Sequence, residues 1–162
     1  MKSLSKIFAR EDLVKQVKDW KAQDKKIVFT NGCFDLLHLG HVDYLEKARS
    51  LGDKLIVGVN TDASVSRLKG PHRPLQDELS RARIMASLLF IDAVVLFDED
   101  TPYELIKSLL PDILVKGDDY NIQNIVGHDI VLQNGGDVKT IRLVKGYSTS
   151  GIVEKIKAQI KA

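Results

Sequence analysis

The chain has 162 residues, of which 44% are hydrophobic and 28% are charged. This length and composition are typical of one folded domain, and we expect a single domain over residues 1–162. The 24 basic and 22 acidic side chains nearly balance, so the net charge gives no reason to expect nonspecific binding to nucleic acid. The sequence contains one cysteine, Cys33, and therefore no internal disulfide, which is typical of a reducing compartment and favours a cytoplasmic protein.

No segment of the sequence is typical of export or of membrane insertion. The first 20 residues mix charges throughout and lack the basic start, the apolar middle and the small-residue cleavage site of a secretory signal. No apolar run approaches the roughly 18 residues needed to cross a bilayer. We therefore expect a protein that is neither exported by that route nor embedded in a membrane.

The first third of the chain predicts a helix followed by a β-α-β unit. Apolar residues recur at helical spacing from 11 to 21, and a β-branched and aromatic run at 26–30 ends in Asn31-Gly32. This pattern predicts a helix, then a buried strand and a loop. Helical spacing returns at 42–51, and a second apolar strand is predicted at 54–60.

The same alternation continues to the end of the chain. The elements predicted next are a helix at 78–89, a strand at 93–97, a helix at 102–110, a strand at 113–116, a short helix at 127–134, a strand at 138–144 and an amphipathic helix at 148–160. Because the strands are apolar nearly throughout, we expect helices on both faces of a parallel sheet of about five strands, a Rossmann-like three-layer α/β domain. Ligands of such sheets bind beyond the carboxyl ends of the strands.

The loop after the first predicted strand contains two histidines at the expected start of a helix. His38 and His41 are three residues apart, so both imidazoles lie on one helix face. Gly32 and Gly40 lack the Cβ atoms that keep a bulky anion from the backbone, and a helix N-terminus offers unpaired N–H groups. The pattern favours a polyphosphate site. The alternatives are a helix cap with a surface histidine, or a two-histidine metal site completed by Asp35.

Residues 32–41, Gly-Cys-Phe-Asp-Leu-Leu-His-Leu-Gly-His, resemble the His-X-Gly-His motif of the nucleotidylyltransferase superfamily. The resemblance covers most of the chain, from about Lys26 to Ile156. Further segments resemble the adenylyltransferase domain that makes ADP-heptose from heptose 1-phosphate: residues 58–62, 67–70, 98–102, 114–120 and 148–150. The resemblance implies direct displacement, in which a phosphate oxygen of the acceptor attacks the α-phosphorus of ATP and pyrophosphate leaves without a covalent enzyme intermediate.

The resemblance also implies roles for individual residues. His38 and His41 would donate hydrogen bonds to triphosphate oxygens in the transition state, and Lys69 would reach the acceptor phosphate or the α-phosphate. Asp35, Lys69 and Arg73 would bind the acceptor. The residues implied to bind the nucleotide are Gly32, Cys33, Phe34, Asp35, Gly40, Lys116, Gly117, Asp118, Ser148, Thr149 and Ser150.

Several of these residues also have a structural interpretation. Lys69 is alternatively an ordinary loop lysine, residues 148–150 an N-cap of the last helix, and Asp118 a solvated carboxylate in a turn where related heptose enzymes have glycine. Arg142 and Lys145 precede residues 148–150, and the sequence does not decide which of the two contacts the triphosphate. Cys33 is interpreted as a loop residue and not as a nucleophile.

Two further residues belong to the resemblance but have simple structural explanations. Asp62 is expected to cap a short helix that follows Thr61. Arg81 aligns with a recurrent arginine of the superfamily, and an ion pair with Asp77 or Glu78 explains it equally well.

The resemblance implies an adenylyltransferase that uses ATP and a phosphorylated sugar, with D-glycero-D-manno-heptose 1-phosphate as the specific acceptor, in ADP-heptose synthesis for the lipopolysaccharide core. Mg²⁺ is expected with ATP, held by phosphates and water without a dedicated protein metal site, and relatives imply a homodimer. The alternatives are a cytidylyltransferase acting on glycerol 3-phosphate or a similar phosphorylated alcohol, and a noncatalytic nucleotide-binding regulatory module. A dinucleotide-dependent oxidoreductase is disfavoured because the first strand lacks Gly-X-Gly-X-X-Gly.

Overall fold

Parallel strands form one sheet in the order β1-β4-β3-β2-β5-β6 in the computed structural model, which describes residues 3–160. The predicted domain of residues 1–162 thus extends at each end to residues outside the described part. The strands are β1 (Ile7–Phe8), β2 (Ile27–Gly32), β3 (Lys54–Asn60), β4 (Ala93–Phe97), β5 (Ile113–Gly117) and β6 (Asp137–Ile141). The chain order reverses between β2 and β5, which places the expected ligand crevice at the carboxyl ends of these two central strands.

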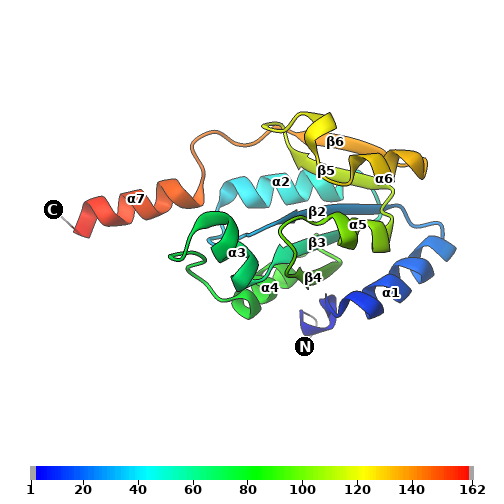
Figure 1. The fold of residues 1–162 in the computed structure, drawn as a ribbon, viewed down its shortest axis with the longest axis horizontal. Coiled ribbons are helices and arrows are strands. Elements are labelled where there is room, and N and C mark those ends of the chain that lie inside the picture. The colour runs from blue at the N-terminus through cyan, green and yellow to red at the C-terminus, as the bar shows by residue number, and fades with distance from the viewer. Residues whose placement is uncertain (1–2, 161–162) are drawn as a thin grey trace.

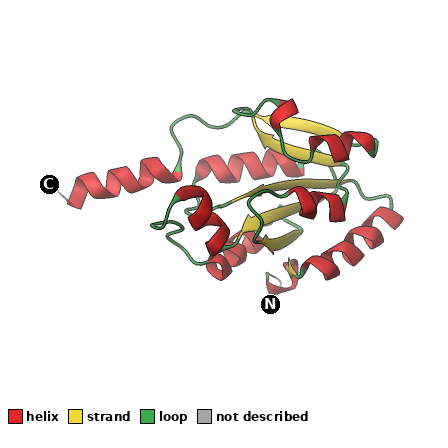
Figure 2. Ribbon diagram, viewed as in Figure 1, coloured by secondary structure: helices red, strands yellow, loops and turns green. Residues whose placement is uncertain are grey.

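Helices cover both faces of the sheet (Figures 1 and 2). They are α1 (Arg10–Ala22), α2 (Leu39–Arg49), α3 (Asp62–Lys69), α4 (Glu78–Ser87), α5 (Tyr103–Leu109), α6 (His128–Gln133) and α7 (Thr149–Ile160), with 3₁₀ turns η1 (Leu4–Lys6) and η2 (Ile122–Asn124). Side chains of α2 and α4 share one buried cluster with the sheet, and side chains of α1, α5 and α6 share another. The predicted three-layer Rossmann-like architecture is confirmed.

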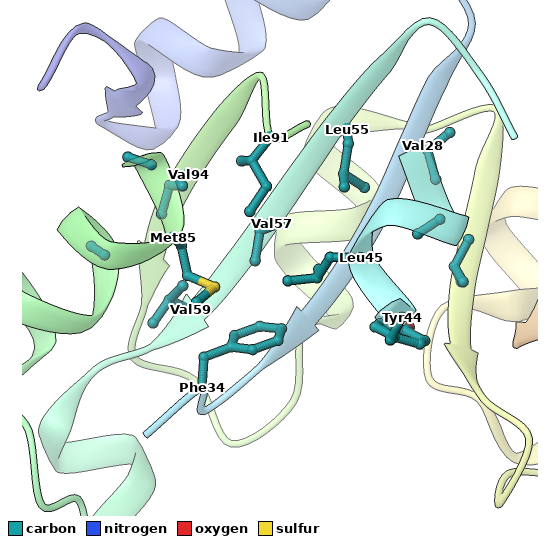
Figure 3. Packing of buried hydrophobic residues seen from close by; sticks show 14 of the residues in the cluster. Val28, Phe34, Tyr44, Leu45, Leu55, Val57, Val59, Met85, Ile91 and Val94 are labelled. Atoms are coloured by element: carbon teal, nitrogen blue, oxygen red, sulfur yellow. The ribbon is translucent and has the colours of Figure 1, made fainter. Parts of the chain in front are cut away.

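The two clusters follow from the alternation of side chains along each strand. Val28, Leu55 and Val57 pack against α2 and α4 (Figure 3), while their neighbours Phe29 and Ile56 point to the opposite cluster. All five side chains are fully buried. Strands that are apolar on both faces are therefore held between two helical layers, and this rigid sheet positions the loops at its carboxyl edge.

The structure differs from the predicted elements mainly at strand ends. Strand β1 was not predicted, because two residues are too few to produce a periodic pattern. Strand β2 continues two residues beyond the predicted end, since Asn31 and Gly32 pair with Gly58 and Val59 of β3. Strand β6 ends at Ile141, three residues before the predicted end.

Helix α7 forms where the amphipathic pattern predicts it, but it does not join the core. It extends away from the sheet (Figure 1), and none of its residues is buried. Ile156 and Ile160 are 49% and 80% exposed. The apolar side of the helix is thus open along most of its length.

Candidate functional site

The loop between β2 and α2 brings His38 and His41 together. His38 precedes the helix in extended backbone, and its carbonyl accepts a hydrogen bond from the His41 amide at 2.9 Å. The two imidazole rings stack with their centroids 3.8 Å apart and their planes 18° apart. Phe34 meets the His41 ring edge-on at a centroid distance of 5.3 Å. The pair is therefore one packed unit at the N-terminus of α2.

Burial sets the protonation of this pair. It lowers the pKa of His38, and burial together with the neighbouring His38 ring lowers the pKa of His41 to about 4. Both imidazoles are therefore neutral at pH 7, and each retains one N–H donor. The Nδ1 atoms of both rings and Oδ1 of Asn31 are buried without a hydrogen-bond partner among the described residues. Buried polar atoms are normally paired, so this loop has unused hydrogen-bonding capacity.

Gly32 and Gly40 make room for the side chains of the same loop. A Cβ at Gly40 would lie 3.1 Å from Nδ1 of His38 and 3.3 Å from the Cβ of Tyr147, and one at Gly32 would lie 3.1 Å from the Phe34 ring. These contacts are tighter than nearly all real Cβ contacts. The packing of the loop thus explains both glycines, while close approach of a phosphate to them stays a prediction.

Asp35 joins two loops. One is the loop between β2 and α2, residues 33–38, here called the histidine loop, and the other is the segment between α3 and α4, residues 70–77. Its carboxylate is 2% exposed and accepts hydrogen bonds from Nε of Arg73 at 2.6 Å and from the amides of Leu75 and Gln76 at 2.8 and 3.0 Å. Burial alone would raise the pKa of Asp35, but the amides of Gln76 and Leu75 and the Arg73 guanidinium hold it below its usual value.

These contacts bear on the metal-site alternative from the sequence. Both carboxylate oxygens of Asp35 already accept hydrogen bonds from protein groups, and residues 3–160 contain no cluster of three or more histidine, cysteine or acidic side chains that could hold a metal ion. Asp35 is therefore already engaged by protein donors, and the two-histidine metal site that it would complete stays an untested alternative. Asp35 orients loop amides and Arg73.

Arg81 links three loops at the carboxyl edge of the sheet. Its guanidinium is fully buried and donates to the carbonyls of Cys33 and Asn60, each at 2.7 Å, and of Gln76 at 3.0 Å, and to the Asp62 carboxylate at 2.7 Å. The loops after β2 and β3 and the segment before α4 are thereby fixed to one side chain. Sequence reasoning missed this role.

The expected partners of these residues are corrected by the structure. Asp77 caps α4 by accepting the Ser80 amide, and Glu78 accepts the Asp62 amide, so neither is the partner of Arg81. The predicted cap at Asp62 is also wrong, because the Thr61 hydroxyl caps α3. The sequence did contain a signal that Arg81 is buried. Arg81 lies four residues before Met85, on the face of α4 that packs against the sheet.

Lys116 lies at the end of β5, beside the histidine loop. Its ammonium donates to the Asn31 carbonyl at 3.1 Å and lies 5.8 Å from the centre of the Tyr120 ring. Burial lowers the pKa of Lys116 to about 8. The neighbouring Asp118 is exposed, and its carboxylate accepts the Leu143 amide at 3.2 Å. Asp118 thus joins β5 to the chain after β6, and its contact with the nucleotide stays a prediction.

Cys33 and Gly117 lie at the same edge of the sheet. Burial raises the pKa of the Cys33 thiol, although the charges of Lys69 and Arg81 oppose the increase. The thiol is therefore not activated, in agreement with its interpretation as a loop residue. A Cβ at Gly117 would lie 2.5 Å from Oδ1 of Asp119 and 3.0 Å from Cδ1 of Leu143, so a side chain here would displace these two side chains.

The start of α7 lies against the histidine loop. The Ser148 hydroxyl accepts the Gly151 amide at 3.0 Å, which confirms its structural interpretation as an N-cap. The Thr149 hydroxyl is 3.5 Å from the Leu36 carbonyl. Ser150 lines a cavity together with Arg73. The loop after β2, the segment around Arg73 and the start of α7 therefore meet.

Three basic residues predicted for the site are exposed. Lys69 is the last residue of α3 and not a loop residue as expected, and its charge acts on the Cys33 thiol. Arg142 and Lys145 both follow β6 and have no side-chain partner in the part of the chain that the structure describes. The roles of all three toward phosphate stay predictions.

Comparisons with known proteins show which family the chain is similar to. A family model described as cytidylyltransferase-like matches residues 29–155. The bifunctional protein HldE of Magnetococcus marinus is 60% identical over 144 residues, which are 89% of this chain and 30% of that protein. The HldE of Azorhizobium caulinodans is 57% identical over 92% of this chain and 31% of that protein. The chain thus spans about a third of the length of these relatives.

Two solved structures share the fold. A lipopolysaccharide core biosynthesis protein from Thermoplasma volcanium superposes with a TM-score of 0.62 at 32% identity, covering 76% of this chain and 99% of that one. A pantoate-beta-alanine ligase from Francisella tularensis superposes with a TM-score of 0.57 at 16% identity, covering 96% of this chain and 79% of that one. The second likeness shows the fold alone.

Proposed function

Because the chain belongs to the cytidylyltransferase-like family and is thereby a nucleotidyltransferase, we propose that it transfers AMP from ATP to a sugar 1-phosphate and releases pyrophosphate. The acceptor is D-glycero-D-manno-heptose 1-phosphate, and the product is ADP-heptose. The observation that supports this most is the neutral, stacked pair of His38 and His41 at the start of α2, with a buried nitrogen unpaired on each ring.

The reaction requires positioning and neutralisation of charge more than a strong base. An oxygen of the acceptor phosphate forms a bond to the α-phosphorus, the bond from the α-phosphorus to the oxygen that bridges to the β-phosphorus breaks, and pyrophosphate leaves with the electron pair. The attacking phosphate is already nucleophilic. His38 and His41 would donate hydrogen bonds to triphosphate oxygens as negative charge develops, which neutral imidazoles can do.

The remaining site residues divide between the two substrates. Lys69 and Arg73 would supply positive charge for the acceptor phosphate, with Asp35 holding Arg73 in place. The turn after β5 and the start of α7 would bind the nucleotide. Mg²⁺ bound to ATP would supply further neutralisation of charge. Since the described residues offer no three-ligand cluster, its ligands would be phosphate oxygens and water.

Two further proposals concern the setting of the enzyme. We place it in the cytoplasm, where ATP and sugar phosphates are available; within residues 3–160, no helix combines the length and apolarity that crossing a membrane requires.

We also propose a homodimer in which a second copy covers the stripe of Ile152, Ile156 and Ile160 on α7. An isolated helix of 12 residues is marginal in water, so this exposed helix needs a partner.

The proposed function is tested by measuring pyrophosphate release in the presence of Mg²⁺. Each of the four nucleoside triphosphates is combined with a panel of sugar 1-phosphates and polyol phosphates. Turnover with ATP and heptose 1-phosphate that collapses in His41→Ala is the expected result. Turnover only with CTP and glycerol 3-phosphate would favour the second candidate, which the family description supports. Tight ATP binding without pyrophosphate from any acceptor would indicate a regulatory module.

A further inference from the structure

A cavity of about 270 Å³ separates the segment after α3 from one side of α7. One wall consists of His72, Arg73 and Leu75, and the other of Ser150, Val153, Glu154 and Lys157. Of these residues, only Arg73 and Ser150 belong to the site predicted from the sequence. The cavity therefore adds a set of polar groups to which the reaction has so far given no role.

The cavity has a near end and a far end relative to the histidine loop. Arg73 is bound to Asp35, and Thr149, next to Ser150, contacts the Leu36 carbonyl, so this end adjoins the loop after β2. The helix rises about 1.5 Å per residue, which places Lys157 about 10 Å beyond Ser150 along the axis. Glu154 and Lys157 pair at 3.3 Å at the far end.

The order of charges along the cavity matches a phosphorylated polyol. A guanidinium at the near end suits a phosphate. A carboxylate at the far end can accept hydrogen bonds from two neighbouring hydroxyls, because an ionised carboxylate has two acceptor oxygens. The cavity thus offers positive charge near the reacting groups and a hydroxyl acceptor away from them.

We propose that this cavity binds the sugar of the acceptor and that Glu154 determines specificity by accepting hydrogen bonds from the terminal hydroxyls of the sugar. Lys157 is a positioning residue that holds the Glu154 carboxylate. This inference rests on the proposed function and names the part of the site that distinguishes a seven-carbon sugar from shorter ones.

The exposure of the pair makes the inference testable. The side chains of Glu154 and Lys157 are 72% and 61% exposed, and exposed ion pairs contribute little to stability. Neutral replacements should therefore fold normally. At 100° per residue, the mean direction of Ile152, Ile156 and Ile160 lies about 110° around the helix from that of the cavity-lining residues, and only Val153 borders the isoleucines.

The experiment compares Glu154→Gln and Lys157→Gln with two matched controls, Glu104→Gln on the exposed side of α5 and Lys155→Gln, whose side chain does not line the cavity. KM and kcat are measured for ATP, for heptose 1-phosphate and for mannose 1-phosphate, which lacks one hydroxymethylene group. Loss of the charged acceptor in Glu154→Gln should raise KM for heptose 1-phosphate about 10-fold or more. It should also reduce the preference for heptose over mannose, with kcat and KM for ATP unchanged.

The outcomes separate this inference from the proposed function. The inference alone is overturned if the wild type is active and Glu154→Gln keeps the same KM for heptose 1-phosphate and the same preference for heptose over mannose. It is also overturned if Glu154→Gln raises KM for ATP and KM for the acceptor equally. If the wild type transfers nothing to any sugar 1-phosphate, the proposed function fails. Calorimetric titration of heptose 1-phosphate in the presence of α,β-methylene ATP then decides: binding that Glu154→Gln weakens supports the cavity assignment, and no binding to the wild type overturns it.

Discussion

The imidazole rings of His38 and His41 stack with their centroids 3.8 Å apart, and the first ring also affects the protonation of the second. The His38 ring is one of the causes that lower the pKa of His41 to about 4, after burial. Protonating either ring would place a buried cation against its neighbour. The pair is therefore suited to donate hydrogen bonds in the neutral state and unsuited to act as a permanent cation.

Removing one of these donors should lower kcat while leaving the fold intact. We expect His38→Ala or His41→Ala to reduce kcat about 10²- to 10³-fold, because a donor directed at charge that develops in the transition state is lost. Pyrophosphate release at saturating ATP and acceptor measures the effect, and circular dichroism checks the fold. His128→Ala, at the start of α6, is the matched control. A decrease below 3-fold in both histidine variants would remove them from the reaction.

The stability of the free protein should depend on pH through His41. Its pKa is about 4 in the folded protein against an ordinary value of 6.5, so between these values the unfolded chain binds a proton that the folded protein does not. The contribution of His41 to the free energy of unfolding is fully present above pH 6.5. It falls by roughly 3 kcal/mol as the pH decreases toward 4. The lowered pKa of His38 acts in the same direction.

Urea unfolding at several pH values in this window measures that slope. His41→Gln should flatten it, while His72→Gln, on an exposed residue of the segment after α3, should leave it unchanged. Asp35 does not interfere, because its pKa is lowered from 3.8 and its contribution is lost only at still lower pH. An equal slope in wild type and His41→Gln would assign the pH dependence to other groups.

Most of the fold could be predicted because most strands can be recognised from their local sequence alone. The runs at Leu55 and Val94 are apolar on both faces, and their burial between helices follows directly. Strand β1 could not be predicted, since only its pairing of Ile7 with Val94 and Phe8 with Val95 defines it. That pairing is a long-range contact to which no local pattern corresponds.

The site was predictable where a motif fixes it and not where it depends on distant contacts. The spacing of His38 and His41 places them together within one helical turn. By contrast, Arg81 finds its acceptors at Cys33, Asn60 and Gln76 only after three loops meet. The nearest charged residues in sequence were therefore the wrong partners to expect.

Arg81→Met should be among the most destabilising substitutions in the chain. It keeps much of the side-chain volume but leaves the carbonyls of Cys33 and Asn60 without their donor, at a cost of about 3 kcal/mol or more. For a domain of this size the melting temperature should fall by roughly 6 to 12 °C. Differential scanning calorimetry measures it, with Arg67→Met as the control because Arg67 pairs with Asp100 on the surface. Equal melting temperatures for the two variants would contradict the linking role.

Asp35 and Arg73 should act as one unit. Asp35→Asn loosens the guanidinium and Arg73→Gln removes it, so each should raise KM for the acceptor more than KM for ATP. The double variant should be little worse than Arg73→Gln alone, because the carboxylate acts by holding Arg73. A double-mutant cycle in KM measures the coupling, and Asp43→Asn, which breaks only an exposed pair with Lys47 on α2, is the control. Additive effects would show that Asp35 acts independently of Arg73.

The isoleucine stripe of α7 should set the oligomeric state. Ile156 lies at its centre and is 49% exposed in the single chain, so a lysine here is tolerated by a monomer but places a charge in the middle of an apolar interface. We expect wild type to sediment as a dimer and Ile156→Lys to sediment as a monomer over the micromolar range. Ile122→Lys, at a residue of similar exposure (42%) in η2, should leave the dimer intact.

A wild type that stays monomeric throughout this range would refute the proposed dimer, and dissociation by both variants alike would place the interface elsewhere. Loss of activity that accompanies dissociation in Ile156→Lys alone would further link the dimer to the site, because α7 also supplies Thr149 and Ser150 next to the histidine loop.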